Sequence, residues 1–119
     1  MKRTLYFTDR ALEDIQEIYD YSVTEWGERT ALKYLQGFEE IFSLLRENIG
    51  LLKKNDKISF RFKVYPVQKH FLICDILDDT IYILSVLHTS LNLWDRLKDL
   101  EPALNEEVLT LMKKINRQP

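Results

Sequence analysis

The sequence contains few of the residue types that build metal, disulfide and nucleotide sites. Its 119 residues include one cysteine, Cys74, and two histidines, His70 and His88. A single thiol excludes an internal disulfide and a cysteine-rich zinc site, and it suits a reducing compartment, so we expect a cytoplasmic location. The three glycines each stand alone, which excludes a phosphate-binding glycine loop. We therefore expect no metal and no cofactor.

Long apolar runs are also missing. After Lys2 and Arg3 the apolar run covers only residues 5–7, too short for an export signal or a membrane span. With 45% apolar and 30% charged residues, the composition is typical of one globular domain. We expect residues 1–102 to form its main part and residues 103–119 to be a C-terminal helical extension of the same domain.

An excess of positive charge is absent overall but present locally. The formal net charge is −2, which argues against a protein that coats nucleic acid through its total charge. Residues 51–70 nevertheless carry six basic side chains and one acidic side chain. This segment is either an ordinary solvated face or a surface that binds a polyanion.

The first half of the chain reads as a strand and two helices. A short strand is predicted over residues 3–7, before the Thr8-Asp9 capping signal. Apolar residues recur every three or four positions over residues 11–26 and 31–45, which predicts two helices. The first ends near Gly27 and the second around residues 48–50. So short a connection predicts an antiparallel helical hairpin.

The second half begins with strands. Residues 58–65 alternate between apolar and polar side chains up to Pro66, which we expect to end the strand. Residues 71–77 and 81–88 are apolar on both faces and are joined by an Asp-Asp turn. The expected fold class is α+β, an antiparallel meander of residues 58–88 with the N-terminal strand at one edge. Strands apolar on both faces need two covers, and the hairpin supplies one.

The C-terminal segment is a candidate for the second cover. We expect Ser90 to cap a short helix that ends at Pro102. A further helix should follow over residues 103–117, because an apolar stripe runs along it. This stripe packs on the chain's own sheet or faces a second copy or a different partner.

Two kinds of chemistry fit the cations near the sheet, which are Arg61, Lys63, Lys69, His70 and His88. The cations could bind a polyanion such as a nucleic acid, with Tyr65 or Tyr82 stacking on a base. Alternatively they could cleave RNA without a metal, with His88 as the acid or base. Each histidine could also be a half-buried imidazole with a purely structural role. Cys74 lies in an apolar strand and is expected to be an inert core residue.

The order of these elements and the sequences of several of them resemble those of a known superfamily. Residues 11–21, 25–27, 34–35 and 42–45 resemble the helical hairpin of the RelE/ParE toxins. Residues 61–67 and 81–88, with their Val-Leu-His ending, are similar to the sheet of the ParE, or plasmid-stabilisation, branch. The resemblance covers residues 3 to about 100, so residues 1–102 are identified as a RelE/ParE-like toxin domain.

The resemblance implies a toxin of a type II toxin–antitoxin pair, neutralised by a small ParD- or RelB-like antitoxin. Such an antitoxin could form the second cover and fold on binding. A homodimer or a toxin–antitoxin hetero-oligomer is compatible with this reading. The candidate antitoxin- or target-binding residues are Arg61, Lys63, Tyr65, Lys69, His70, Tyr82, His88 and Trp94.

The resemblance leaves the target to be chosen between two branches. RelE-like members cut mRNA in the ribosome with basic residues and, in the type example, a C-terminal tyrosine. This chain has no tyrosine after Tyr82 and no arginine or lysine between Lys69 and Arg96. We therefore favour a non-enzymatic, ParE-like inhibitor that traps the cleaved-DNA complex of DNA gyrase. The alternatives are a RelE-like endonuclease, using Arg61, Lys63 and His88, and a degenerate toxin that retains only antitoxin binding.

Overall fold

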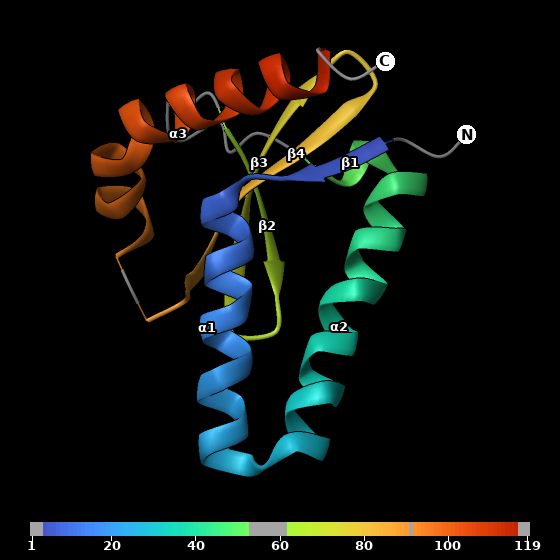
Figure 1. Cartoon of the computed structure of the whole chain (residues 1–119), viewed down its shortest axis with the longest axis vertical. Coiled ribbons are helices and arrows are strands. Elements are labelled where there is room, and N and C mark those ends of the chain that lie inside the picture. Colours follow the sequence, from blue (N-terminus) through green and yellow to red (C-terminus); the bar gives the residue numbers. More distant parts are fainter. Residues whose placement is uncertain (1–3, 53–61, 91, 117–119) are drawn as a thin grey trace.

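The computed structural model describes residues 4–52, 62–90 and 92–116. Within them the chain has the predicted α+β fold, with one mixed sheet between two helical layers (Figure 1). In chain order the elements are β1 (Thr4–Phe7), α1 (Asp9–Trp26), α2 (Glu28–Glu47), the 3-10 helix η1 (Ile49–Leu51), β2 (Lys63–Val67), β3 (His70–Leu77), β4 (Thr80–His88) and α3 (Leu93–Asn116).

The sheet has the strand order β1-β4-β3-β2. Strands β2, β3 and β4 form the predicted antiparallel meander, and β1 joins one edge, parallel to β4. The start of the strand expected at residue 58 lies outside the described residues. Its expected end at Pro66 is wrong, because β2 continues through Pro66 to Val67. Proline is tolerated there because β2 is an edge strand, where a missing N–H removes no bond from a further neighbour.

The two N-terminal helices form the predicted hairpin, and Figure 1 shows them diverging from the turn at Gly27. The hydroxyl of Thr8 accepts from the Ala11 N–H at 3.1 Å and donates to the Leu84 carbonyl at 2.9 Å. The same side chain thus caps α1 and ties it to β4. At the other end, Gly27 has φ +88°, a conformation that L side chains rarely adopt.

The hairpin covers one face of the sheet. Phe38 and Leu45 from α2 pack there against Leu72, Ile81 and Ile83. Cys74 lies in the same cluster and is fully buried, and this burial raises the pKa of its thiol. Its position fits the expectation of an inert core residue.

The other face of the sheet is covered by α3. Leu97, Leu104 and Val108 are fully buried against a cluster that includes Ile73 and Leu84. The second cover of the sheet therefore comes from this chain. This confirms the first of the predicted alternatives, in which the C-terminal stripe packs on the chain's own sheet. Within the part of the chain that the structure describes, no helix is both long and apolar enough to span a membrane.

Two details of the C-terminal prediction are wrong. The segment is one helix with Pro102 inside it, where two helices were expected. Buried leucines on both sides of the proline anchor the helix to the same core, which offsets the lost backbone bond. Ser90 does not cap the helix, because the Asn92 side-chain oxygen accepts the Asp95 N–H at 3.4 Å.

Candidate functional site

A groove of about 510 Å³ opens on the hairpin side, where α1, the start of α2, the β3–β4 strand ends and the first turn of α3 meet. It combines aromatic, cationic and acidic side chains from elements that are far apart in the sequence. Its lining residues are Asp14, Glu17, Ile18, Tyr21, Ser22, Trp26, Tyr34, Lys69, His70, Val86, Leu87, His88, Ser90 and Arg96.

The two histidines of the chain meet in this groove. His70 and His88 are directly paired residues on β3 and β4. Their ring centroids are 5.0 Å apart and the ring planes are nearly perpendicular, at 87°. The sequence predicted both as candidate contact residues, and the sheet register brings them together.

His70 is held in its neutral form. It is only 8% exposed, and burial, with a smaller contribution from His88, lowers its pKa to about 4. Its Nδ1 lies 2.9 Å from the Tyr34 hydroxyl. With the His70 proton on Nε2 the hydroxyl donates to Nδ1, and with the proton on Nδ1 the ring donates to the hydroxyl.

The neighbouring Ser90 defines the tautomer of His88 in its neutral form. The Ser90 N–H donates to its Nδ1 at 3.0 Å, and the Ser90 hydroxyl lies 2.7 Å from the same nitrogen. Because Nδ1 accepts, the proton of the neutral ring lies on Nε2. The Nδ1 of each imidazole is therefore engaged by a hydrogen bond within this chain.

A glycine allows the β2–β3 turn to approach the helix that carries Tyr34. The Gln68 carboxamide donates to the Tyr34 carbonyl at 2.8 Å. A Cβ on Gly37 would lie 2.6 Å from the Gln68 Nε2, so a side chain there would displace the amide. This contact fixes the turn, and with it Lys69 and His70, against α2.

Asp14 is the acidic group of the groove with defined partners. Its Oδ2 accepts from the Ser85 hydroxyl at 2.7 Å and from the Val86 N–H at 3.0 Å. Ser85 follows the irregularity in the β3–β4 ladder, which lies opposite Ile73 and Cys74. The carboxylate thus satisfies polar groups that the irregular ladder leaves available.

An aromatic wall forms the hairpin end of the groove. The Trp26 ring lies 5.9 Å from Tyr21 and 6.5 Å from Tyr34, centroid to centroid. Helical spacing placed Trp26 on the apolar stripe, yet it is 51% exposed, and Tyr21 is 61% exposed. Clustered exposed aromatic rings of this kind are typical of protein-binding surfaces.

The cations of the groove are Lys69, from the β2–β3 turn, and Arg96, from α3. Along the sequence, the exit of the last strand has no cation before Arg96. In the fold, α3 returns Arg96 to the groove that contains His88. Sequence spacing could not reveal this, since the contact depends on how α3 packs.

The other predicted contact residues lie elsewhere. Lys63 and Tyr65 are half-buried on edge strand β2. Lys63 on β2 pairs with Cys74 on β3, and Cys74 pairs in turn with Ile83 on β4. Ile83 lies five residues before His88, which is about 16 Å along the strand. The structure therefore does not bring Lys63 and His88 together. Arg61 and the Trp94 side chain lie outside the described part of the chain.

Tyr82 does not fit its predicted role as a surface contact. It is buried in the α3 cluster, and its ring stacks on Tyr6 at 6.1 Å. Burial also raises the pKa of its hydroxyl. The last strand is apolar on both faces, so alternation alone could not show that α3 covers Tyr82.

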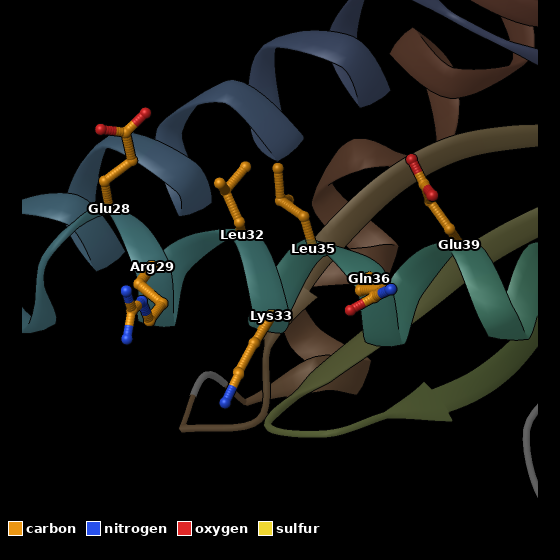
Figure 2. Close-up of a pocket in the computed structure, with 7 residues that line it drawn as sticks. All are labelled: Glu28, Arg29, Leu32, Lys33, Leu35, Gln36 and Glu39. Atoms are coloured by element: carbon orange, nitrogen blue, oxygen red, sulfur yellow. The ribbon is translucent and has the colours of Figure 1, made fainter.

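A second, larger hollow of about 650 Å³ lies on the outer side of α2 (Figure 2). All seven of its lining residues, among them Arg29, Leu32 and Glu39, come from this one helix. Among the described residues, no other element contributes a side chain to it. The groove, where five elements bring aromatic rings, imidazoles and cations together, is therefore the better candidate site.

Comparison with solved structures shows the same fold in three of them. A chromosomal ParDE toxin–antitoxin system from P. aeruginosa matches with a TM-score of 0.62 and 22% identity, covering 73% of this chain and 96% of the other. The RelBE2 toxin–antitoxin complex from Mycobacterium tuberculosis matches with a TM-score of 0.50 and 19% identity, covering 74% and 99%. The YoeB dimer from Staphylococcus aureus matches with a TM-score of 0.50 and 19% identity, covering 74% and 98%.

At the level of sequence, no curated protein matches this chain. A family model does match, over residues 5–93, and it describes the ParE toxin of the type II toxin–antitoxin system parDE. The match begins within β1 and ends at the first residue of α3. Because it spans well over half of the sequence, the chain belongs to the ParE toxin family of type II toxin–antitoxin systems.

Proposed function

We propose that this toxin inhibits DNA gyrase by binding and trapping its cleaved-DNA complex, and that a cognate ParD- or RelB-like antitoxin neutralises it in the cytoplasm. The hydrogen bonding of the two groove histidines carries the choice of a binding toxin over a nuclease. Metal-free RNA cleavage needs a group that takes the proton of the 2′-hydroxyl. Nδ1 of His88 is engaged by Ser90, and Nδ1 of His70 by Tyr34. This engagement makes either ring a poorer base for that step, which supports a binding toxin.

The aromatic wall supports binding as the mode of action. Trp26 and Tyr21 are more than half exposed, although both rings are large and apolar. Burying such rings against a partner removes much apolar surface from water, and tryptophan and tyrosine dominate the energies of many interfaces. The wall therefore suits a toxin that acts by holding a protein.

Gyrase assays test this proposal directly. The purified toxin at micromolar concentration should inhibit DNA supercoiling and increase the yield of cleaved DNA. Trp26→Ala should raise the concentration needed by about tenfold or more, as expected for an interface hot spot. Glu39→Ala on the outer side of α2 is the matched control and should leave inhibition unchanged. Unaffected supercoiling and cleavage with wild-type toxin would overturn the proposal.

One observation favours a second candidate, a ribosome-dependent endoribonuclease. Lys69, His88 and Arg96 line a single groove, so the site is richer in cations than the last strand suggests. The decisive result would be codon-positioned mRNA cuts in a translating extract that disappear in His88→Ala and Arg61→Ala. Cuts of this kind, with gyrase unaffected, would select the nuclease over the gyrase inhibitor.

Induction of the toxin alone in bacteria separates these candidates in cells. A gyrase inhibitor should stop DNA synthesis before protein synthesis, and a ribosomal nuclease should do the reverse. Co-expression of the antitoxin should relieve either arrest. The absence of growth arrest, together with tight capture of the antitoxin, would identify a degenerate toxin.

A further inference from the structure

We propose that the groove binds an acidic peptide segment of a protein partner and that Arg96 holds a carboxylate of this segment. The inference rests on the proposed function only in taking the partner to be a protein. It assigns a specificity-determining role to a residue beyond the family match, which ends at residue 93.

Arg96 is supplied by α3, of which only the first residue lies within the family match. Its buried leucines and the ion pair between Arg10 and Glu107 fix it to the sheet and to α1. The position of Arg96 at the groove follows from this packing.

Three donors with no acidic partner of their own face this groove. Lys69 and Arg96 line it as cations, and within the described residues neither side chain forms an ion pair. His88 adds the N–H of Nε2, because its Nδ1 accepts from the Ser90 N–H. A carboxylate suits such a set, since a guanidinium can donate two parallel bonds to its oxygens. The guanidinium would therefore fix the orientation of the bound carboxylate as well as attract it.

The rest of the groove favours a peptide over a nucleic acid. Trp26 and Tyr21 offer an apolar wall for the residues beside the bound carboxylate. Asp14 and Glu17 line the same groove and would repel a backbone with a charge on every nucleotide. The chain's net charge of −2 acts in the same direction. A peptide with one or two acidic residues next to apolar ones meets the cations with less of this repulsion, because it carries fewer negative charges.

The test is an NMR titration of the full chain with two matched peptides, acetyl-Leu-Phe-Glu-Glu-Leu-amide and its glutamine counterpart. The glutamate peptide should shift the Trp26 indole and His88 signals saturably at millimolar concentration, and the glutamine peptide should bind about tenfold more weakly. Arg96→Gln should weaken the glutamate peptide by about tenfold as well. Lys98→Gln, which removes the same charge from the same helix outside the groove, should change affinity by less than about twofold.

Several results would overturn the inference. These are equal binding of the two peptides, equal effects of Arg96→Gln and Lys98→Gln, no saturable shift, or stronger binding of hexauridylate RNA than of the glutamate peptide. Gyrase inhibition is measured in parallel with the wild-type chain. If the wild-type chain does not inhibit gyrase but still prefers the glutamate peptide, the proposed function is overturned and this inference stands. If it inhibits gyrase but binds the two peptides equally, this inference is overturned and the proposed function stands.

Discussion

The two faces of the sheet differ in what covers them. The α3 face is closed by an apolar cluster in which Leu97, Leu104 and Val108 are fully buried. The hairpin face has a core of similar kind near the middle of the sheet, but towards the β3–β4 ends it changes to buried polar groups and an open groove. The bonds of Asp14 and of the Tyr34–His70 pair lie there.

This difference separates stability from function within one small sheet. An apolar face can be closed by any helix with a matching stripe, and the family match indeed ends at the start of α3. A face with satisfied polar groups needs a defined geometry, because each buried donor or acceptor must keep its partner. We therefore expect substitutions on the α3 side to affect mainly folding, and substitutions of exposed groove residues such as Trp26 and Arg96 to affect mainly binding.

Removal of the second half of α3 should have the largest effect. Truncation after Pro102 deletes Leu104 and Val108, both fully buried. Burying one aliphatic side chain contributes about 1.5–3 kcal/mol, so the truncated chain should lose about 3–6 kcal/mol of unfolding free energy. Thermal and urea unfolding would measure the loss. Truncation after Asn116 is the control, and an unchanged melting temperature of the shorter chain would contradict a structural role for residues 103–116.

Loss of the Asp14 carboxylate should have the next largest effect. Asp14→Ala leaves the Ser85 hydroxyl, which is 1% exposed, and the Val86 N–H without their acceptor. We expect a destabilisation of about 2–3 kcal/mol, which is less than two full bonds to a charged group at about 1.5–3 kcal/mol each, because both bonds are only partly buried and water can replace part of them. Glu13→Ala, an exposed neighbour on α1, should change stability by less than about 0.5 kcal/mol. Equal denaturation midpoints of the two variants would show that the polar side of the sheet does not depend on this carboxylate.

Much of this fold was predictable from the sequence, because period and turn signals agree with the packing. Apolar spacing located both hairpin helices, and the Asp-Asp turn located the β3–β4 hairpin. Pro66 and Pro102 were misjudged for one reason, namely that local rules for proline ignore tertiary context. An edge strand needs no further N–H partner at Pro66, and buried leucines on both sides hold the helix through Pro102.

The groove was only partly predictable. Lys69, His70 and His88 are near the strand ends in the sequence, and the register brings them together there. Arg96 belongs to a helix whose apolar stripe predicted packing on the sheet as one alternative, but the stripe does not show that Arg96 would line the groove. Trp26 fits the apolar stripe of α1, so only the tertiary arrangement at the end of the hairpin reveals its exposure.

The pH dependence of stability should report on the polar side of the sheet. Below pH 6.5 the unfolded chain gains a proton at His70 that the folded chain, with a His70 pKa of about 4, does not bind. Stability is therefore lost as the pH falls from 6.5 towards 4, by about 2 kcal/mol between pH 7 and pH 5. Urea unfolding at both pH values should show a smaller loss in His70→Gln than in wild type. His88→Gln should keep most of the dependence, since burial is the larger cause, and an identical loss in all three proteins would contradict a neutral His70 in the folded state.

The ion pair that joins α3 to α1 should have the smallest effect. Arg10 Nε lies 2.9 and 3.1 Å from the two carboxylate oxygens of Glu107, and both side chains are about one third exposed, at 31% and 32%. The hydrogen bond to Glu107 raises the pKa of Arg10, but water screens a pair at this exposure. A double-mutant cycle with Arg10→Gln and Glu107→Gln should give a coupling energy of about 0.5–1 kcal/mol. The pair of Lys114 and Asp9, 3.9 Å apart and far more exposed, should give about zero in the same cycle. A coupling at Arg10 as large as the loss from truncating α3 would mean that charge, and not apolar burial, attaches the helix, and the contrast between the two faces would then fail.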